Sequence, residues 1–219
     1  MKNLLIIMTI FMTTYSNLFG QESQIDSTIL RVESETIDDM LYTATIRTDY
    51  TLCLTDSIGK IVFKIENSYP NIEFIDFDND GNKDLMISYI SNVPGIQDFV
   101  KYDSKGKSFK LIENFPKYPD SKPIKGTKYF YSYHRSGCAD MNWDSDLFYI
   151  EDFKTIKIGN ISGRECNNEG IDDGIYIYKI RVDNKDLIET LPIDTINKFQ
   201  DYKWGFIADY WTKKYNEFK

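Results

Sequence analysis

The stretch 76–84, Asp-Phe-Asp-Asn-Asp-Gly-Asn-Lys-Asp, constrains the fold more than any other part of this 219-residue sequence. Asp76, Asp78 and Asp80 are two residues apart, and Gly81 permits the sharp turn that brings alternate carboxylates together. Calcium takes about six to eight oxygen ligands, so the pattern predicts a calcium loop. The predicted ligands are the side chains of Asp76, Asp78, Asp80 and Asp84 and the backbone carbonyl of Asn82.

The sequence on either side of this loop is typical of β-strands. The runs 71–75 and 85–90 are short and rich in β-branched and aromatic residues. An EF-hand also needs a bidentate glutamate at its twelfth position, which here is Ile87. We therefore expect the loop to join two strands. A metal-free turn is the alternative, but four aspartates within nine residues repel one another without a cation.

This motif resembles the calcium loop of FG-GAP or integrin-α-like repeats, in which the loop joins strands of a propeller blade. The resemblance covers residues 72–90. A wider resemblance, through Tyr102-Asp103, Phe109 and the aromatic stretch 129–138, is to a group of small exported bacterial proteins with one such loop. That group includes periplasmic immunity proteins that neutralise lysozyme-like effectors. The resemblance therefore implies calcium binding and a protein partner of this class.

Residues 1–20 have the pattern of a signal peptide. Lys2 gives a basic start, the apolar run 4–11 follows, and Phe19-Gly20 before Gln21 is a plausible cleavage site. The apolar run is short for a spanning helix, and an uncleaved anchor is the alternative. We expect a periplasmic or secreted protein with no stable membrane insertion after cleavage.

The charge of the chain bears on its partners. Lys and Arg number 26 and Asp and Glu 34, a net charge of −8, which becomes −9 when Lys2 leaves with the signal peptide. An acidic chain is a poor ligand for nucleic acid, because contacts to phosphate supply most non-specific affinity. It suits a basic protein partner such as a lysozyme-like hydrolase, although solubility alone also accounts for the charge.

The cysteines indicate one disulfide, since an exported chain meets oxidising conditions. Cys138 and Cys166 both lie in loop-like sequence that contains glycine, and they form the better pair. Cys53 lies in the apolar run 50–54 and is expected to be a buried free thiol.

The chain as a whole predicts an all-β fold of mostly antiparallel hairpins in an incomplete, propeller-like arrangement, with a short C-terminal helix. Segment 56–65 resembles 103–112 at an offset of 47 residues, which is close to the period of a propeller blade, and 182–188 is a candidate for a degraded third copy. The alternative is that any two β-hairpins share such turns. The expected organisation is a signal peptide over 1–20, an N-terminal arm over 21–40 and one calcium-binding domain over 41–219.

The C-terminal helix is predicted from the aromatic tail. Aromatic residues within 199–218 fall near helical spacing, so one face of the helix should dock on a sheet. Binding to a membrane surface is the alternative use of that face.

The candidate partner-binding residues are Tyr131, Tyr133, His134 and Arg135, because tyrosine and arginine are enriched at interface hot spots. A structural aromatic strand with a tight turn explains this segment as well. We predict no catalytic residue, since a cysteine near His134 in an exported chain is more often bonded than nucleophilic.

These features together predict a non-enzymatic, exported calcium-binding protein that binds another protein, such as an immunity protein or inhibitor of a lysozyme-like wall hydrolase. Two alternatives stay open. One is an exported polysaccharide-acting hydrolase or lyase with structural calcium, and the other is a calcium-dependent adhesion module.

Overall fold

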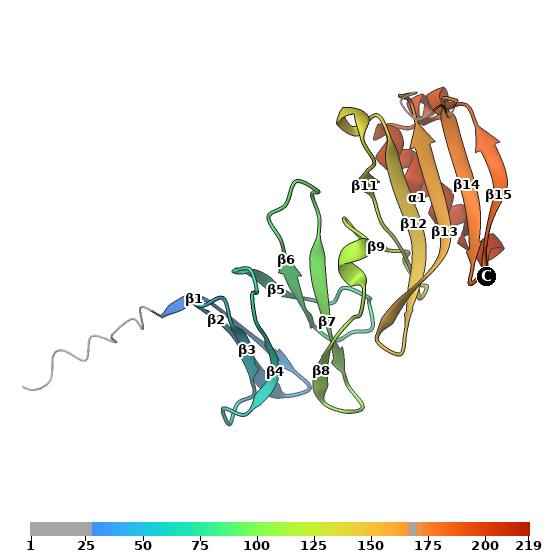
Figure 1. The fold of residues 1–219 in the computed structure, drawn as a ribbon. Coiled ribbons are helices and arrows are strands. Elements are labelled where there is room, and N and C mark those ends of the chain that lie inside the picture. Colours follow the sequence, from blue (N-terminus) through green and yellow to red (C-terminus); the bar gives the residue numbers. More distant parts are fainter. Residues whose placement is uncertain (1–27, 167–169, 171) are drawn as a thin grey trace, which may run out of the picture.

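The computed structural model describes residues 28–166, 170 and 172–219, and it places three antiparallel sheets in succession along the chain (Figure 1). Each of the first two sheets has four strands in chain order. Sheet A contains β1 (Ile29–Ile37), β2 (Met40–Arg47), β3 (Leu52–Thr55) and β4 (Ile61–Ile65). Sheet B contains β5 (Asn71–Ile75), β6 (Asp84–Ser88), β7 (Gln97–Asp103) and β8 (Ser108–Leu111). The prediction of an all-β fold built from antiparallel hairpins is confirmed.

Sheet C is larger and has the order β15-β14-β13-β12-β10-β9, with β11 also paired to β12. Its strands are β9 (Lys122–Pro123), β10 (Tyr129–Tyr131), β11 (His134–Arg135), β12 (Trp143–Glu151), β13 (Lys154–Arg164), β14 (Gly174–Arg181) and β15 (Asn184–Leu191). Strand β9 is at the edge of the sheet, the position where a proline such as Pro123 removes no interior ladder bond. Short 3-10 helices are η1 (Phe115–Lys117), η2 (Cys138–Asp140), η3 (Ile193–Lys198) and η4 (Tyr215–Phe218).

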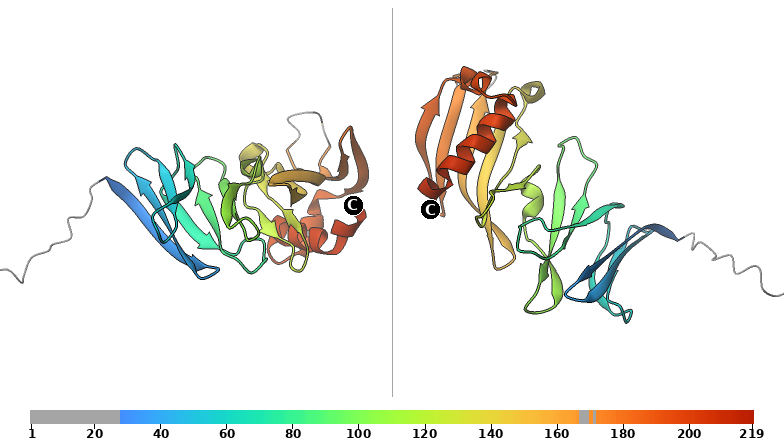
Figure 2. Two further views of the ribbon diagram at one scale, coloured as in Figure 1. Left: turned by 90° about the horizontal axis from the view of Figure 1, so that it is seen from below. Right: turned by 180° about the vertical axis from the view of Figure 1, so that it is seen from behind.

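The C-terminal helix α1 (Tyr202–Lys214) lies across one face of sheet C (Figure 2). Phe206, Ile207 and Trp211 are buried in one core with apolar residues of β12, β13 and β14. The indole Nε1 of Trp211 donates to Ser145 Oγ at 2.8 Å, so its polar atom is satisfied inside that core. The aromatic face of the helix therefore docks on a sheet, as predicted.

Sheet B is buried on both of its faces. Leu85, Ile87 and Val100 belong to the core shared with sheet A, whereas Met86 and Phe99 belong to the core shared with sheet C. Because successive strand residues point to opposite faces, the middle of β6, Leu85-Met86-Ile87, is a continuous apolar run rather than an alternating one. The three sheets thus pack one against the next, in the open, propeller-like arrangement that the sequence predicts.

The predicted repeats lie at equivalent places in the three sheets. Segments 56–65 and 103–112 contain the turns β3–β4 and β7–β8, and 182–188 contains the turn β14–β15. In the first two turns an aspartate accepts from the backbone two residues on, since Ile58 N donates to Asp56 Oδ1 and Lys105 N donates to Asp103 Oδ1. The repeat therefore marks the hairpin that closes each sheet.

The prediction of an N-terminal arm over 21–40 is wrong from Ile29 onward, because β1 occupies most of that segment and pairs with β2. The segment looks like an arm because it is polar. Glu33 and Glu35 occupy half-buried positions of the strand, and the residues that alternate with them face solvent. Residues 1–27, which include the predicted signal peptide over 1–20, lie outside the described part of the chain.

Cys138 and Cys166 are joined by a disulfide, which ties η2 to the end of β13. Disulfides persist in oxidising compartments, so this bond points to an extracytoplasmic protein. Cys53 is a free thiol, and it is half-buried rather than fully buried as expected. In residues 28–166, 170 and 172–219, no helix is both long and apolar enough to cross a membrane.

Candidate calcium site

The aspartate-rich loop joins β5 to β6, and it is fixed through Phe77. This ring is 9% exposed and stacks on Phe130 of β10, with centroids 5.6 Å apart. It also packs edge-on against Phe99 of β7 and Phe115 of η1. One residue of the loop therefore lies in the core between sheets B and C, while its neighbours Asp76 and Asp78 stay outside that core.

Asp76, Asp78 and Asp84 each offer a carboxylate oxygen within 4.8 Å of the other two. Asp84 is fully buried at the start of β6, where its Oδ1 accepts from Tyr102 N at 2.9 Å. Its Oδ2, and Oδ1 of Asp76, are buried and have no hydrogen-bond partner among the described residues. Buried charged oxygens without partners are costly, and a cation beside them would satisfy both.

The backbone of the loop is held by its own aspartates. Asp78 Oδ1 accepts from Asp80 N at 3.2 Å, and Asp76 Oδ2 accepts from Gly81 N at 3.2 Å. Gly81 has φ of +93°, a conformation that glycine adopts without strain. These bonds fix the turn and leave Oδ1 of Asp76 without a partner among the described residues, whereas Oδ2 of Asp78 is paired with Lys101.

The electrostatics of Asp84 also favour a cation. Burial raises the pKa of this carboxyl to about 7, the charge of Asp78 adds to the effect, and the bond from Tyr102 N opposes it. A divalent cation reverses this preference, because metal ligands bind in their deprotonated form. The donors are all hard oxygens, a set that suits calcium or magnesium rather than zinc or copper.

The structure brings together part of the predicted ligand set. Asp76, Asp78 and Asp84 converge, but Asp80 is paired with Lys101 Nζ at 2.6 Å. Burial acts to raise the pKa of Asp80, but the bonds from Lys101 and Asn82 outweigh it and lower the pKa. Asn82 donates its side-chain amide to Asp80 Oδ1 at 3.1 Å. Calcium itself stays a prediction.

Sequence reasoning missed Lys101, which lies on β7 and contacts both Asp78 and Asp80. Lys101 is 17 residues beyond Asp84 in the chain. The β6–β7 pairing brings them together by aligning Leu85 with Val100, so that Asp84 and Lys101 come next to each other across the ladder. Only a correct register for this hairpin would have revealed the contact.

The candidate partner-binding residues are mostly engaged within the protein. Tyr131 and Tyr133 are half-buried against the core under α1, and the Tyr133 hydroxyl donates to the Asp140 carboxylate. His134 lies opposite Asp144 in the β11–β12 pair. Arg135 is the most exposed, with 53% of its side chain accessible. Partner binding at this segment stays a prediction.

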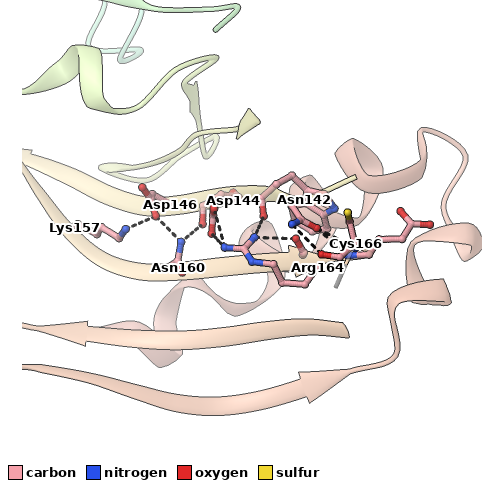
Figure 3. A network of polar contacts seen from close by, with 11 residues as sticks. Asn142, Asp144, Asp146, Lys157, Asn160, Arg164 and Cys166 are labelled. Carbon is pink, nitrogen blue, oxygen red and sulfur yellow. Dashed lines mark hydrogen bonds and ion pairs between the residues drawn. The ribbon is translucent and has the colours of Figure 1, made fainter. Parts of the chain in front are cut away.

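A second polar cluster occupies the face of sheet C that α1 leaves open (Figure 3). Arg164 pairs with Asp144 at 3.2 Å, and Lys157 pairs with Asp146 at 2.6 Å. Asn160 donates to Asp146 Oδ1 at 2.8 Å. Burial acts against ionisation of Asp144, but bonds from Ser136 and the charge of Arg164 outweigh it and lower its pKa. These charges are therefore paired with one another across β12 and β13.

No family model and no curated protein matches the chain. Among solved structures, the chain has a likeness to one titled "Structure of a Xanthomonas Type IV Secretion System related protein". The two are 11% identical, with a TM-score of 0.46, over 72% of this chain and 93% of that chain. A likeness at this level assigns neither a function nor a partner to this chain.

Proposed function

We propose that the protein is an exported, non-enzymatic binding protein in which one calcium ion holds the 76–84 loop in place. The observation that carries the calcium proposal is Asp84, a fully buried carboxylate whose Oδ2 has no hydrogen-bond partner in the described structure. Asp76 and Asp78 stand beside it with oxygens at ligand spacing.

The ion has a structural role in this proposal. It neutralises the repulsion among the aspartates and so fixes the loop from which Phe77 enters the core between sheets B and C. At millimolar extracellular calcium, a site with a submillimolar Kd adds about 1–2 kcal/mol to stability by mass action.

The proposed partner is a basic protein, most concretely a lysozyme-like wall hydrolase that this chain inhibits. The net charge of −9 after removal of 1–20 supports this choice, because opposite fields steer association and raise its rate. The resemblance of the calcium loop and the 129–138 stretch to exported immunity proteins supports it as well. The disulfide fits a periplasmic or secreted location.

Calcium titration of the chain from residue 21 onward, by calorimetry and by terbium luminescence, tests the first half of the proposal. We expect one site in the wild type and none in Asp84→Asn, which keeps the side-chain volume and removes a ligand charge. Asp56→Asn is the matched control, because Asp56 holds a similar turn in sheet A and belongs to no carboxylate cluster among the residues that the structure describes. No binding by the wild type at millimolar calcium contradicts the proposal.

A turbidity assay on cell-wall substrate tests the second half. We expect the protein to slow clearing by an added basic lysozyme-like hydrolase, and we expect high salt to weaken this inhibition because it screens the charges. Clearing by the protein alone favours the polysaccharide-acting alternative. Absence of inhibition across several such hydrolases contradicts the proposed partner class.

A further inference from the structure

Lys101 occupies the position that a competing cation would take. Its side chain extends from β7 and is 21% exposed, and its ammonium bridges Asp78 and Asp80, at 2.6 Å from Asp80 Oδ2. Both partners belong to the ligand set that the sequence predicts for calcium. The lysine is therefore bonded to the site itself rather than to the solvent around it.

The ammonium satisfies the cluster only in part. It brings one positive charge to a group of four aspartates, and it leaves the buried oxygens of Asp76 and Asp84 unpartnered within the described chain. A calcium ion carries twice that charge and reaches several oxygens at once. The two cations cannot share the same oxygens of Asp78 and Asp80, because calcium needs them free and repels a nearby ammonium.

We propose that Lys101 is an internal competitor for the calcium site, and that calcium binds by displacing its ammonium from Asp78 and Asp80. This inference rests on the proposed calcium binding. The competition weakens the apparent calcium affinity, so the site fills only where free calcium is high, as it is outside the cytoplasm. At low calcium the same contacts keep the loop closed in place of the ion.

The strand register indicates where the displaced side chain goes. Lys101 is aligned with Lys110 on β8, and Lys110 is already paired with Asp103 at 3.0 Å. A like charge directly opposite disfavours a new position over β8. The released ammonium therefore turns to solvent, and its amine becomes more accessible when calcium is bound.

Two variants of the mature chain test the competition. Lys101→Met keeps an unbranched apolar stem and removes the charge, and Lys110→Met removes the aligned lysine, which is not bonded to the loop. By calcium calorimetry we expect Lys101→Met to bind about tenfold more tightly than the wild type, a change of about 1.4 kcal/mol. Lys110→Met should bind like the wild type.

A labelling experiment follows the displacement directly. The wild type is treated with a lysine-acylating reagent in calcium or in EGTA, and the modified peptides are quantified by mass spectrometry. We expect acylation of Lys101 to rise severalfold in calcium, while acylation of Lys110 stays constant.

The outcomes separate this inference from the proposed function. If the wild type binds calcium but Lys101→Met binds no more tightly, or if calcium leaves the labelling of Lys101 unchanged, the competition is refuted and the calcium site stands. If neither the wild type nor Lys101→Met binds calcium, both proposals fail. Binding by Lys101→Met alone supports the block by Lys101 but refutes calcium as a ligand of the wild type, so the proposed structural role of calcium fails in that case.

Discussion

Replacement of Phe77 tests whether the 76–84 loop stabilises the packing of sheet B on sheet C. The ring is 9% exposed and makes aromatic contacts with Phe99, Phe115 and Phe130, which come from both sheets and the connector between them. Phe77→Leu keeps most of the apolar volume and loses three ring–ring contacts. We expect it to lower the free energy of unfolding by about 1–2 kcal/mol, because each such pair contributes about 0.5–1.5 kcal/mol beyond burial and leucine recovers part of it. Phe77→Ala should cost about 3–5 kcal/mol.

The calcium affinity of the Phe77 variants distinguishes a residue that positions the loop from an ordinary core residue. If the ring positions the loop, its loss should also weaken calcium binding, by about two- to fivefold for a coupling of about 0.5–1 kcal/mol. The matched control is Phe109→Leu, since Phe109 is buried in the core on the other face of sheet B and contacts Tyr42 and Tyr102. The control should lose similar stability and keep the calcium affinity of the wild type.

Urea unfolding in calcium and in EGTA provides the assay. Trp143, Trp204 and Trp211 all lie in sheet C or α1, so tryptophan fluorescence reports on the half of the chain that does not contain the 76–84 loop. Calcium should raise the urea midpoint of the fluorescence transition in the wild type. The rise should be smaller in Phe77→Leu and as large as in the wild type in Phe109→Leu. If calcium raises the unfolding midpoint of Phe77→Leu by as much as it raises that of the wild type, the proposed link between the Phe77 ring and the position of the loop is refuted.

Three further results are expected. In EGTA, the free energy of unfolding should fall by up to about 4 kcal/mol as pH rises from about 4 to 7, because the folded protein holds a proton on Asp84 that the unfolded chain has released. Asp84→Asn should remove this pH dependence in thermal melts. Calcium affinity, measured by calorimetry, should be about tenfold weaker at pH 6 than at pH 8, because calcium competes with that proton. Gly159→Ala should lower the free energy of unfolding in urea by about 1–3 kcal/mol, because the added Cβ would lie 2.8 Å from Phe218 and 2.9 Å from Trp211 in the core under the C-terminal helix. Unchanged stability would contradict this close packing.

The features that the sequence predicts correctly are those encoded by local spacing. Strands β5 and β6 follow from the β-rich runs on either side of the aspartate-rich loop. The closeness of Asp76 and Asp78 agrees with their separation of two residues and with the turn at Gly81, while the ligand set itself stays a prediction. The docking of α1 follows from the helical spacing of its aromatic residues.

The features that it misses depend on pairing between distant segments. Strand β1 is polar and forms through its ladder with β2, so it carries little signal of its own. The pairing of Lys157 with Asp146 depends on the β12–β13 register, which is shifted by a bulge between Leu147 and Phe148. The contact of Lys101 with the loop depends in the same way on one hairpin register. Residues on a single loop can be grouped from sequence, but residues on two strands cannot be grouped until the pairing is known.

The position of the 76–84 loop explains why an ion bound there would affect the whole chain. Sheet B is the middle sheet, and each of its faces contributes to a different core. Asp84 opens β6, the strand from which Leu85 enters one core and Met86 the other, and Phe77 enters the second core from the loop itself. A shift of this loop therefore disturbs both cores at once. A hairpin of sheet A faces only the core shared with sheet B, so an ion bound there would hold the packing of two sheets, whereas an ion on the 76–84 loop would hold the packing of all three.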